Sequence, residues 1–193
     1  MSESFPAGDH PAVPPVTGAE LLELLVDEGV THVLGLPDND TARLFDLLQE
    51  NPLVRLVRVA REGEAFAAAA GLWLGGAMPF VVLQNTGLLE SGDALRGTVS
   101  RMGVPLVVLV GYRGFARMRA AGRDTPPLPL EREDLVRREL DSVALMTEPT
   151  LAAWGVPCER LGGQDDPGRI RAAFHRSRSE ERPVALLLSH PLA

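Results

Sequence analysis

The stretch REGEAFAAAAGLWLGGAMPFVVLQNTG, residues 61–87, decides the fold class of this chain. Glu62 and Glu64 open it, and acidic residues favour the first turn of a helix because that end carries a partial positive charge. Small alanine and glycine residues follow and predict a thin helix over 62–74. The uncharged run 80–83 then predicts a buried strand that ends in polar residues at 84–87. A carboxylate at the start of such a helix is expected to be partly desolvated, which suits a group that holds a proton.

Helix and strand patterns alternate on both sides of this stretch. Further helices are expected over residues 17–28, 41–49, 91–100, 131–140, 148–154 and 167–178. Strands are expected over 30–35, 54–59, 80–83, 105–110, 158–161 and 184–188. The segment 112–130, rich in arginine and proline, is expected to be a long loop that has room for one helical turn. Apolar strands that alternate with helices predict an α/β fold, a mainly parallel sheet with helices on both faces.

Length and composition favour one globular domain. The 193 residues are 45% hydrophobic and 23% charged, which is ordinary for globular proteins. Residues 17–193 are expected to form a single domain. Residues 1–16 are expected to be a flexible N-terminal tail, since they lack the basic start and apolar core of a secretory signal. The apolar runs are far shorter than the roughly 20 residues of a membrane span, so no membrane partner is expected.

The net charge and the cysteine content further limit the classes of partner and metal site that this chain can have. A net charge of −7 argues against nucleic acid, because phosphate binding needs a concentrated basic surface. The single cysteine, Cys158, excludes an internal disulfide and a multi-cysteine metal site, and it fits a cytoplasmic location. The four histidines lack metal-ligand spacing, so no metal ligands are expected within this chain.

Polar or turn-forming residues end three of the expected strands, at 37–39, 61–62 and 84–87. Ligands of open parallel sheets bind at the carboxyl ends of strands. These three segments therefore mark the expected site, provided that they converge in the fold.

These motifs also resemble those of a known family. Glu62-x-x-Ala65 and Gln84-Asn85-Thr86-Gly87, with Gly35-Leu36-Pro37 upstream, resemble the pyrimidine-binding domain of thiamine diphosphate enzymes, in particular the sulfopyruvate and phosphonopyruvate decarboxylases. The resemblance covers about residues 18–113 and, weakly, the last forty residues. Three motifs in the same order and spacing make it fairly specific.

The resemblance implies a catalytic role for Glu62. One glutamate of that family hydrogen-bonds N1′ of the cofactor aminopyrimidine and so promotes deprotonation of the thiazolium C2. Glu62 is the matching position in this sequence and would both bind the cofactor and activate it. Glu64 lies about 200° further round the helix and cannot share that role. Without the resemblance, Glu62 is more simply an acid favoured by the helix dipole.

The resemblance also implies the remaining site residues. Asp38 or Asn39, directly after the Gly-Leu-Pro turn, would face the substrate, although each is also an ordinary turn former. The residues expected beside the pyrimidine ring are Pro37, Gln84, Asn85 and Thr86.

The segment Gly111-Tyr112-Arg113-Gly114 resembles the entrance of these decarboxylases, where Arg113 could pair with an anionic group of the substrate. The family then continues to an Asp-x-Pro-Gln-His element, whereas residues 124–128 here are Asp-Thr-Pro-Pro-Leu. Because the Gln and His are missing, three alternatives stay open: the substrate is a different acid, a partner supplies the missing group, or the reaction itself is changed.

The family's second cofactor element is absent. A Gly-Asp-Gly motif with a downstream Asn, which holds Mg²⁺ and the diphosphate, does not occur in this sequence. The resemblance therefore implies half of an enzyme: an α chain that binds the pyrimidine of thiamine diphosphate, self-associates, and needs a diphosphate-binding β subunit to decarboxylate a small 2-oxo acid. A carboligase half-enzyme, which would use an aldehyde acceptor, and a non-catalytic binding module, which would tolerate loss of Glu62, remain alternatives. A flavodoxin-like protein is disfavoured, because the acidic segment 38–40 stands where a phosphate-binding loop would be needed.

Overall fold

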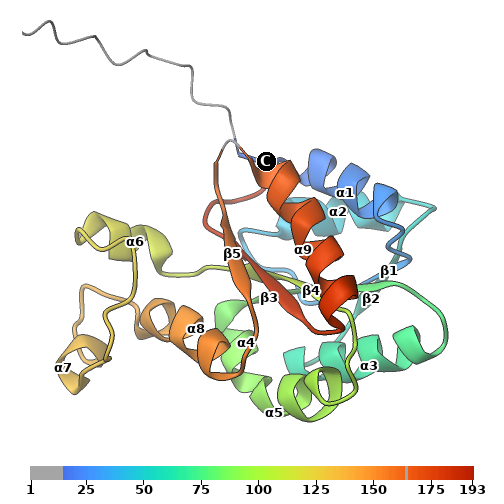
Figure 1. The fold of residues 1–193 in the computed structure, drawn as a ribbon. Coiled ribbons are helices and arrows are strands. Elements are labelled where there is room, and N and C mark those ends of the chain that lie inside the picture. The colour runs from blue at the N-terminus through green and yellow to red at the C-terminus, as the bar shows by residue number, and fades with distance from the viewer. Residues whose placement is uncertain (1–14, 164) are drawn as a thin grey trace, which may run out of the picture.

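Six parallel strands form one sheet in the order β2–β1–β3–β4–β6–β5 (Figure 1). The structure is a computed structural model that describes residues 15–163 and 165–193. The expected tail over residues 1–16 therefore lies almost wholly outside the described residues. The strands are β1 (His32–Gly35), β2 (Arg55–Arg58), β3 (Pro79–Gln84), β4 (Val107–Gly111), β5 (Cys158–Leu161) and β6 (Val184–Leu188). Every neighbouring pair is parallel, which confirms the expected sheet.

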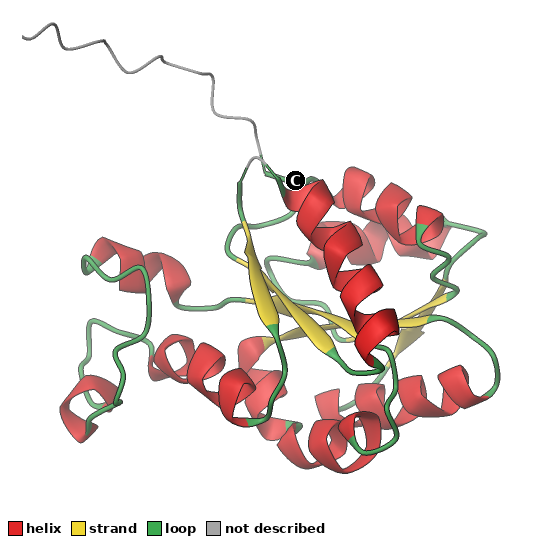
Figure 2. Cartoon of the chain, viewed as in Figure 1, coloured by secondary structure: helices red, strands yellow, loops and turns green. Residues whose placement is uncertain are grey.

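Helices cover both faces of this sheet, as expected (Figures 1 and 2). One face packs against α1 (Gly18–Asp27), α2 (Ala42–Glu50) and α9 (Asp166–Glu180). The other is covered by α3 (Glu62–Leu74), α4 (Asn85–Glu90), α5 (Gly92–Ala94), the π-helical turn η1 (Leu95–Ser100) and α8 (Ser142–Ala153). Each face has its own hydrophobic core, so the central strands β3, β4 and β6 are buried throughout, apart from the partly exposed Gln84. No helix within the described ranges is both long and apolar enough to cross a membrane.

The start of α3 is fixed by a capping interaction that places Glu62 at its first position. The Glu64 carboxylate accepts hydrogen bonds from the backbone N–H groups of Ala60 and Arg61, at 3.0 and 3.3 Å. These donors precede the helix and would otherwise lack partners. The helix cap thus uses the carboxylate of Glu64 and not that of Glu62.

Two helices differ from the sequence-based expectation over residues 112–140. Part of the expected loop is the helix α6 (Phe115–Ala120), because Phe115 and Met118, one turn apart, are both buried and hold the turn against the core. The expected charged helix over 131–140 shortens to α7 (Arg132–Leu135), none of whose residues is buried. A helix with no buried face gains nothing from packing, and packing provides most helical stability in proteins.

Two further helices begin earlier than expected. Helix α8 starts at Ser142 rather than residue 148, since Asp141 caps it by accepting a hydrogen bond from the Val143 N–H. Pro149 lies inside that helix, although proline favours the first helical position. The expected helix over 91–100 is preceded by α4, which begins directly after Gln84.

Candidate functional site

The carboxyl ends of the parallel strands meet at one edge of the sheet, where a cavity of about 470 Å³ opens. Its lining comes from four segments and includes Asn39 and Asp40 after β1, Gln84 at the end of β3, Arg113 after β4, and Ser189 and His190 after β6. A larger cavity of about 820 Å³ follows the edge strand β2 and contains none of the expected site residues. We therefore place the site at the smaller cavity, where strand-end residues from four segments converge.

Glu62 lies directly against the first turn of α4. A Cβ atom built on Gly87 would overlap the Glu62 side chain, so the carboxylate rests on a backbone position that only glycine leaves open. Glu62 is partly exposed and has no hydrogen-bond or ion-pair partner among the described residues. The fold thus brings Glu62 to the segment 84–87, as the order of the motifs implied. Arg61, the residue before Glu62, pairs with Glu90 at the end of α4 and ties the two helices together.

The turn after β1 approaches β3 closely. Gly35 has a φ of +156°, and a Cβ there would overlap the backbone carbonyl oxygen of Val82. This close approach is part of the β1–β3 ladder, in which Gly35 pairs with Val82, and the exposed Pro37 follows it.

The Asp38 carboxylate holds this turn together. Its Oδ1 accepts hydrogen bonds from the Asp40 N–H at 2.9 Å and from the Thr41 N–H and hydroxyl at 2.8 Å each. Its Oδ2 is buried against Gly111, without a hydrogen-bond partner among the described residues. Asn39 is exposed and lines the cavity. Of the two expected substrate-facing residues, Asn39 therefore faces the cavity, whereas Asp38 shapes the turn.

Asp40 was not singled out from the sequence, yet its side chain lines the same cavity. Burial raises the pKa of Asp40, and the nearby Asp38 charge raises it further, while His190 acts in the opposite direction. His190, set aside from its sequence context, lines the cavity as well, and its Nε2 is 3.2 Å from the Val16 carbonyl oxygen. The sequence does not show which of Asp38 and Asp40 faces the cavity. The two residues differ in that only the Asp38 carboxylate accepts the hydrogen bonds of the turn.

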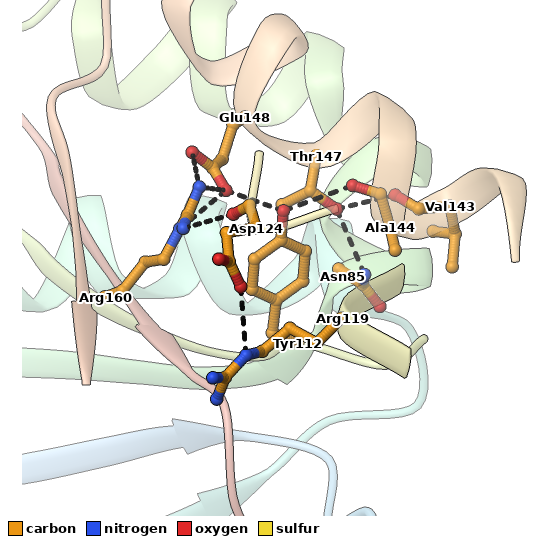
Figure 3. A network of polar contacts seen from close by, with 9 residues as sticks. All are labelled: Asn85, Tyr112, Arg119, Asp124, Val143, Ala144, Thr147, Glu148 and Arg160. Atoms are coloured by element: carbon orange, nitrogen blue, oxygen red, sulfur yellow. Dashed lines mark hydrogen bonds and ion pairs between the residues drawn. The ribbon is translucent and has the colours of Figure 1, made fainter. Parts of the chain in front are cut away.

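The amide of Asn85 points into the protein interior (Figure 3). Asn85 is fully buried, and its Nδ2 donates hydrogen bonds to the Arg113 carbonyl oxygen and to the Thr147 hydroxyl, both at 3.0 Å. Its neighbours differ: Gln84 lines the cavity, and the exposed Thr86 donates a hydrogen bond from its hydroxyl to the Gln84 amide oxygen at 3.2 Å. The Asn85 side chain thus fixes the segment that carries Arg113.

Arg113 is the cationic group of the cavity. Its side chain is 57% exposed, and its Nε lies 3.2 Å from Oδ2 of Asp141, the residue that caps α8. The guanidinium keeps further N–H donors that this single contact does not use. It is therefore available to a carboxylate, sulfonate or phosphonate group in the cavity.

A polar network that the sequence did not reveal surrounds Tyr112, the residue before Arg113 (Figure 3). Glu148 on α8 accepts from the Tyr112 hydroxyl at 2.7 Å and from two nitrogens of Arg160 on β5, at 2.9 and 2.8 Å. Arg160 also donates to the Asp124 carbonyl oxygen at 2.6 Å. Burial and then the Glu148 hydrogen bond raise the pKa of Tyr112, so its hydroxyl remains a donor. This network fastens the divergent segment after Arg113 to the sheet.

The surroundings of Cys158, beside this network, disfavour its thiolate form. Burial and the Glu148 charge raise the pKa of the Cys158 thiol to about 11. The thiolate, which is the reactive form, is therefore scarce at neutral pH.

Comparisons with known proteins agree with this geometry. The profile of the family described as "Thiamine pyrophosphate enzyme, N-terminal TPP binding domain" matches residues 16–129. The chain is 34% identical to phosphonopyruvate decarboxylase of Streptomyces viridochromogenes over 111 residues, 58% of this chain and 27% of that protein. It is 28% identical to sulfopyruvate decarboxylase subunit alpha of Methanothermobacter thermautotrophicus over 88 residues, 46% of this chain and 53% of that subunit.

A third relative, alpha-keto-acid decarboxylase of Mycobacterium leprae, is 35% identical over 95 residues, 49% of this chain and 16% of that protein. The matched segments thus cover from about a sixth to about half of the sequence length of these relatives. The family match covers more than half of the chain and includes the segments that carry Glu62, Gln84 and Arg113. The chain belongs to the thiamine pyrophosphate enzymes, as their N-terminal, cofactor-binding domain.

Proposed function

We propose that this chain is the pyrimidine-binding subunit of a thiamine diphosphate-dependent 2-oxo acid decarboxylase that works with a separate diphosphate-binding β subunit. The observation that carries the proposal is the contact between Glu62 and Gly87, because it sets an unpartnered carboxylate beside the segment expected to flank the pyrimidine. The named activities of the relatives, decarboxylation of phosphonopyruvate, sulfopyruvate and α-keto acids, support the reaction class.

The residues present fit a bound pyrimidine ring. Glu62 offers an oxygen with no internal partner to a ring nitrogen, and Gly87 leaves the space that the carboxylate occupies. Pro37 and Thr86 are exposed at the same edge, and Gln84, which accepts a hydrogen bond from the Thr86 hydroxyl, lines the cavity. Asn85 supports this segment from the interior.

The cofactor, when bound, supplies an electron sink for the loss of CO₂. This chain's part is to hold a proton between Glu62 and the pyrimidine and to orient the acid substrate. Arg113 would bind an anionic group of a sulfopyruvate- or phosphonopyruvate-like acid, and Asn39, which lines the same cavity, would offer its amide. Asp38 would act through the turn that presents Asn39.

The partner is proposed from the missing diphosphate element. The described residues contain no group of three His, Cys, Asp or Glu side chains suited to a metal ion, and the sequence lacks the Gly-Asp-Gly element. We therefore assign Mg²⁺ and the diphosphate to the β subunit, as the subunit name of the methanogen relative suggests. Self-association of the α chain and a cytoplasmic location remain part of this proposal.

Calorimetric titration tests the cofactor assignment. Thiamine diphosphate with Mg²⁺ is titrated into the chain alone and into a mixture with a candidate β subunit, and CO₂ release is then screened over 2-oxo acids. Binding and turnover are expected only in the mixture. Absence of binding with a genuine partner would favour the non-catalytic module, and carbon–carbon bond formation with an aldehyde would favour the carboligase.

A pair of variants tests the role of Glu62. Glu62→Gln is expected to lower turnover by about 10²–10⁴-fold, since it removes the group that holds the proton. Glu23→Gln is the control, because Glu23 is exposed on α1, far along the chain from the site. Full turnover by Glu62→Gln in the assembled enzyme would contradict the assignment.

A further inference from the structure

Another cavity near the carboxyl edge of the sheet is lined by three arginine side chains. This cavity of about 290 Å³, which we call the arginine cavity, is lined by Phe115, Arg119, Asp124, Arg160, Arg169, Ser189 and residues 161–163. Asp124 is the one acid among the described lining residues, so the lining carries three positive charges and one negative charge. The whole chain, by contrast, has a net charge of −7. The fold therefore gathers cationic groups here against the average charge of the molecule.

The arginine cavity adjoins the candidate site along helix α6. Between the two lies a cavity of about 510 Å³, which shares Ala116 with the candidate site and both Arg119 and Asp124 with the arginine cavity. Ser189, after β6, lines all three cavities. The arginine cavity is thus a neighbour of the candidate site, but Arg113 is not part of its lining.

Two of the three arginines keep most of their N–H donors available. The Arg119 Nε lies 3.1 Å from Oδ1 of Asp124, and since the two side chains are 64% and 79% exposed, this pair contributes little to stability. Arg169 donates from Nη1 to the Arg160 carbonyl oxygen at 2.8 Å and has no ion-pair partner in the described part of the chain. A guanidinium has five N–H donors, so Arg119 and Arg169 can both still bind an oxyanion.

Arg160 forms a fixed wall of the arginine cavity. Its Nε and Nη2 donate to the two carboxylate oxygens of Glu148, at 2.9 and 2.8 Å, and its Nη1 donates to the Asp124 carbonyl oxygen at 2.6 Å (Figure 3). The guanidinium also lies over the Phe115 ring, 5.2 Å from the ring centre. A cation that is already held in place need not be ordered when a ligand binds, which lowers the cost of binding.

The arginine cavity lies where this sequence departs from its family. Arg119 and Asp124 belong to the divergent segment after Arg113. Arg160 and Arg169 lie beyond residue 129, where the family match ends. The positive charge of this cavity is therefore a property of this chain's own sequence.

We propose that the arginine cavity is a second anion-binding site, which takes a phosphate or phosphonate group through Arg119 and Arg169, with Arg160 as its fixed cationic wall. Arginine suits such groups because its planar donors can pair with two oxygens at once. The exposed Asp124 carboxylate can be displaced from Arg119 by an incoming dianion at little cost. The group belongs either to the far end of a phosphonate-bearing substrate or to a separate phosphate-bearing ligand. The inference goes beyond the proposed function and does not depend on turnover.

NMR titration of the full chain with inorganic phosphate tests the site directly. The arginine Nε–H signals are followed in ¹⁵N-labelled protein at constant ionic strength, and each signal is identified by its absence from the matching arginine-to-glutamine variant. The Arg119 and Arg169 signals are expected to shift together and to saturate. Arg117, exposed on the same helix α6 but outside the cavity lining, is expected to show no saturable shift. An equal shift of Arg117 would indicate an adventitious ion only and would overturn the inference.

The same variants test the affinity. Arg119→Gln and Arg169→Gln are each expected to weaken phosphate binding by about tenfold, since each removes a charged donor. Arg117→Gln is the matched control, because it removes the same charge from α6 and leaves the cavity lining unchanged. The two cavity variants alter different helices, α6 and α9, so misfolding of one leaves the other as the test. Wild-type affinity in a folded cavity variant, or an equal loss in Arg117→Gln, would overturn the inference.

Phosphonopyruvate and pyruvate distinguish the two sources of the group. If phosphonopyruvate shifts the Arg113 signal together with those of Arg119 and Arg169, the group belongs to the substrate. If it shifts only the latter two, the cavity serves a separate ligand, and both results support the site. Pyruvate lacks the phosphonate and is expected to leave Arg119 and Arg169 unshifted, so a saturable shift equal to that of phosphonopyruvate would overturn the assignment. Absence of CO₂ release by the assembled enzyme would refute the proposed function alone, because phosphate binding is measured on the chain by itself.

Discussion

Replacing Gly87 by alanine should displace the Glu62 side chain and leave the fold intact. The added Cβ would overlap the Glu62 side chain, whereas contacting carbon atoms ordinarily lie about 3.5–4.0 Å apart. The α4 backbone is held by β3 and by the packing of Leu88, so the partly exposed Glu62 side chain is the part that can move. It must withdraw by roughly 1 Å or change rotamer.

The expected magnitudes differ sharply between stability and activity. Alanine gains up to about 1 kcal/mol of helix propensity over glycine, and an off-rotamer Glu62 costs about 0.5–1.5 kcal/mol. The free energy of unfolding should therefore change by less than about 1 kcal/mol. A displacement of about 1 Å at a reacting group can lower the rate by about 100-fold. Turnover should thus fall about 100-fold in a protein that remains folded.

The assay compares Gly87→Ala with Gly71→Ala in the assembled enzyme. A Cβ on Gly71, in α3, has no atom within 4 Å, so this control adds the same methyl group to a helix without displacing a side chain. Urea denaturation of the chain alone checks stability, and CO₂ release with the β subunit checks activity. Wild-type activity in Gly87→Ala would refute the reasoning, because it would show that the position of Glu62 against α4 is not needed.

Three further outcomes can be checked on the isolated chain. Gly35→Ala should destabilise it by at least about 4 kcal/mol or prevent folding, because the new Cβ would overlap the Val82 carbonyl oxygen; soluble yield and urea denaturation measure this. Glu148→Gln should lower the free energy of unfolding by about 1–3 kcal/mol, since Arg160 and Tyr112 lose a charged acceptor, and wild-type stability would contradict the network in Figure 3. The pKa of Asp40 is raised in the folded chain, so ionisation of Asp40 lowers the stability of the fold as the pH rises above 3.8, the ordinary pKa of an aspartate. Asp40→Asn should therefore be more stable than the wild type at pH 7. Thermal unfolding should show that this difference disappears below pH 3.8.

The sheet was predictable because its signals are local. Strands β5 and β6 have the bounds expected from their apolar runs, residues 158–161 and 184–188. The uncharged residues of β3 and β4 correctly indicated burial on both faces. Errors fell where distant contacts decide local structure. Helix α6 exists because Phe115 and Met118 reach the core, and α7 is short because none of its residues is buried.

The site was predictable only in part. The motifs identified the strand ends, and Gln84, Asn39 and Arg113 do line one cavity. Which acid faces that cavity was not readable, because Asp38 and Asp40 share a turn and differ only in their hydrogen bonds.

The interior neighbours of the site were not readable either. The burial of the Asn85 amide depends on Thr147, which lies on α8, 62 residues further along the chain. Glu148 and Arg160 likewise meet across α8 and β5, and no sequence period links them.

The glycines at the carboxyl edge have a consequence for redesigning the site. Gly87 and Gly111 each leave space that an acid occupies, Glu62 in one case and Asp38 in the other. A side chain at either position would move an acid, so variants there change the chemistry and the pocket shape together. Asn39 and Ala116 line the same cavity with exposed side chains. Libraries aimed at a new substrate should vary these two positions and keep the glycines, so that selectivity can change while the acids stay in place.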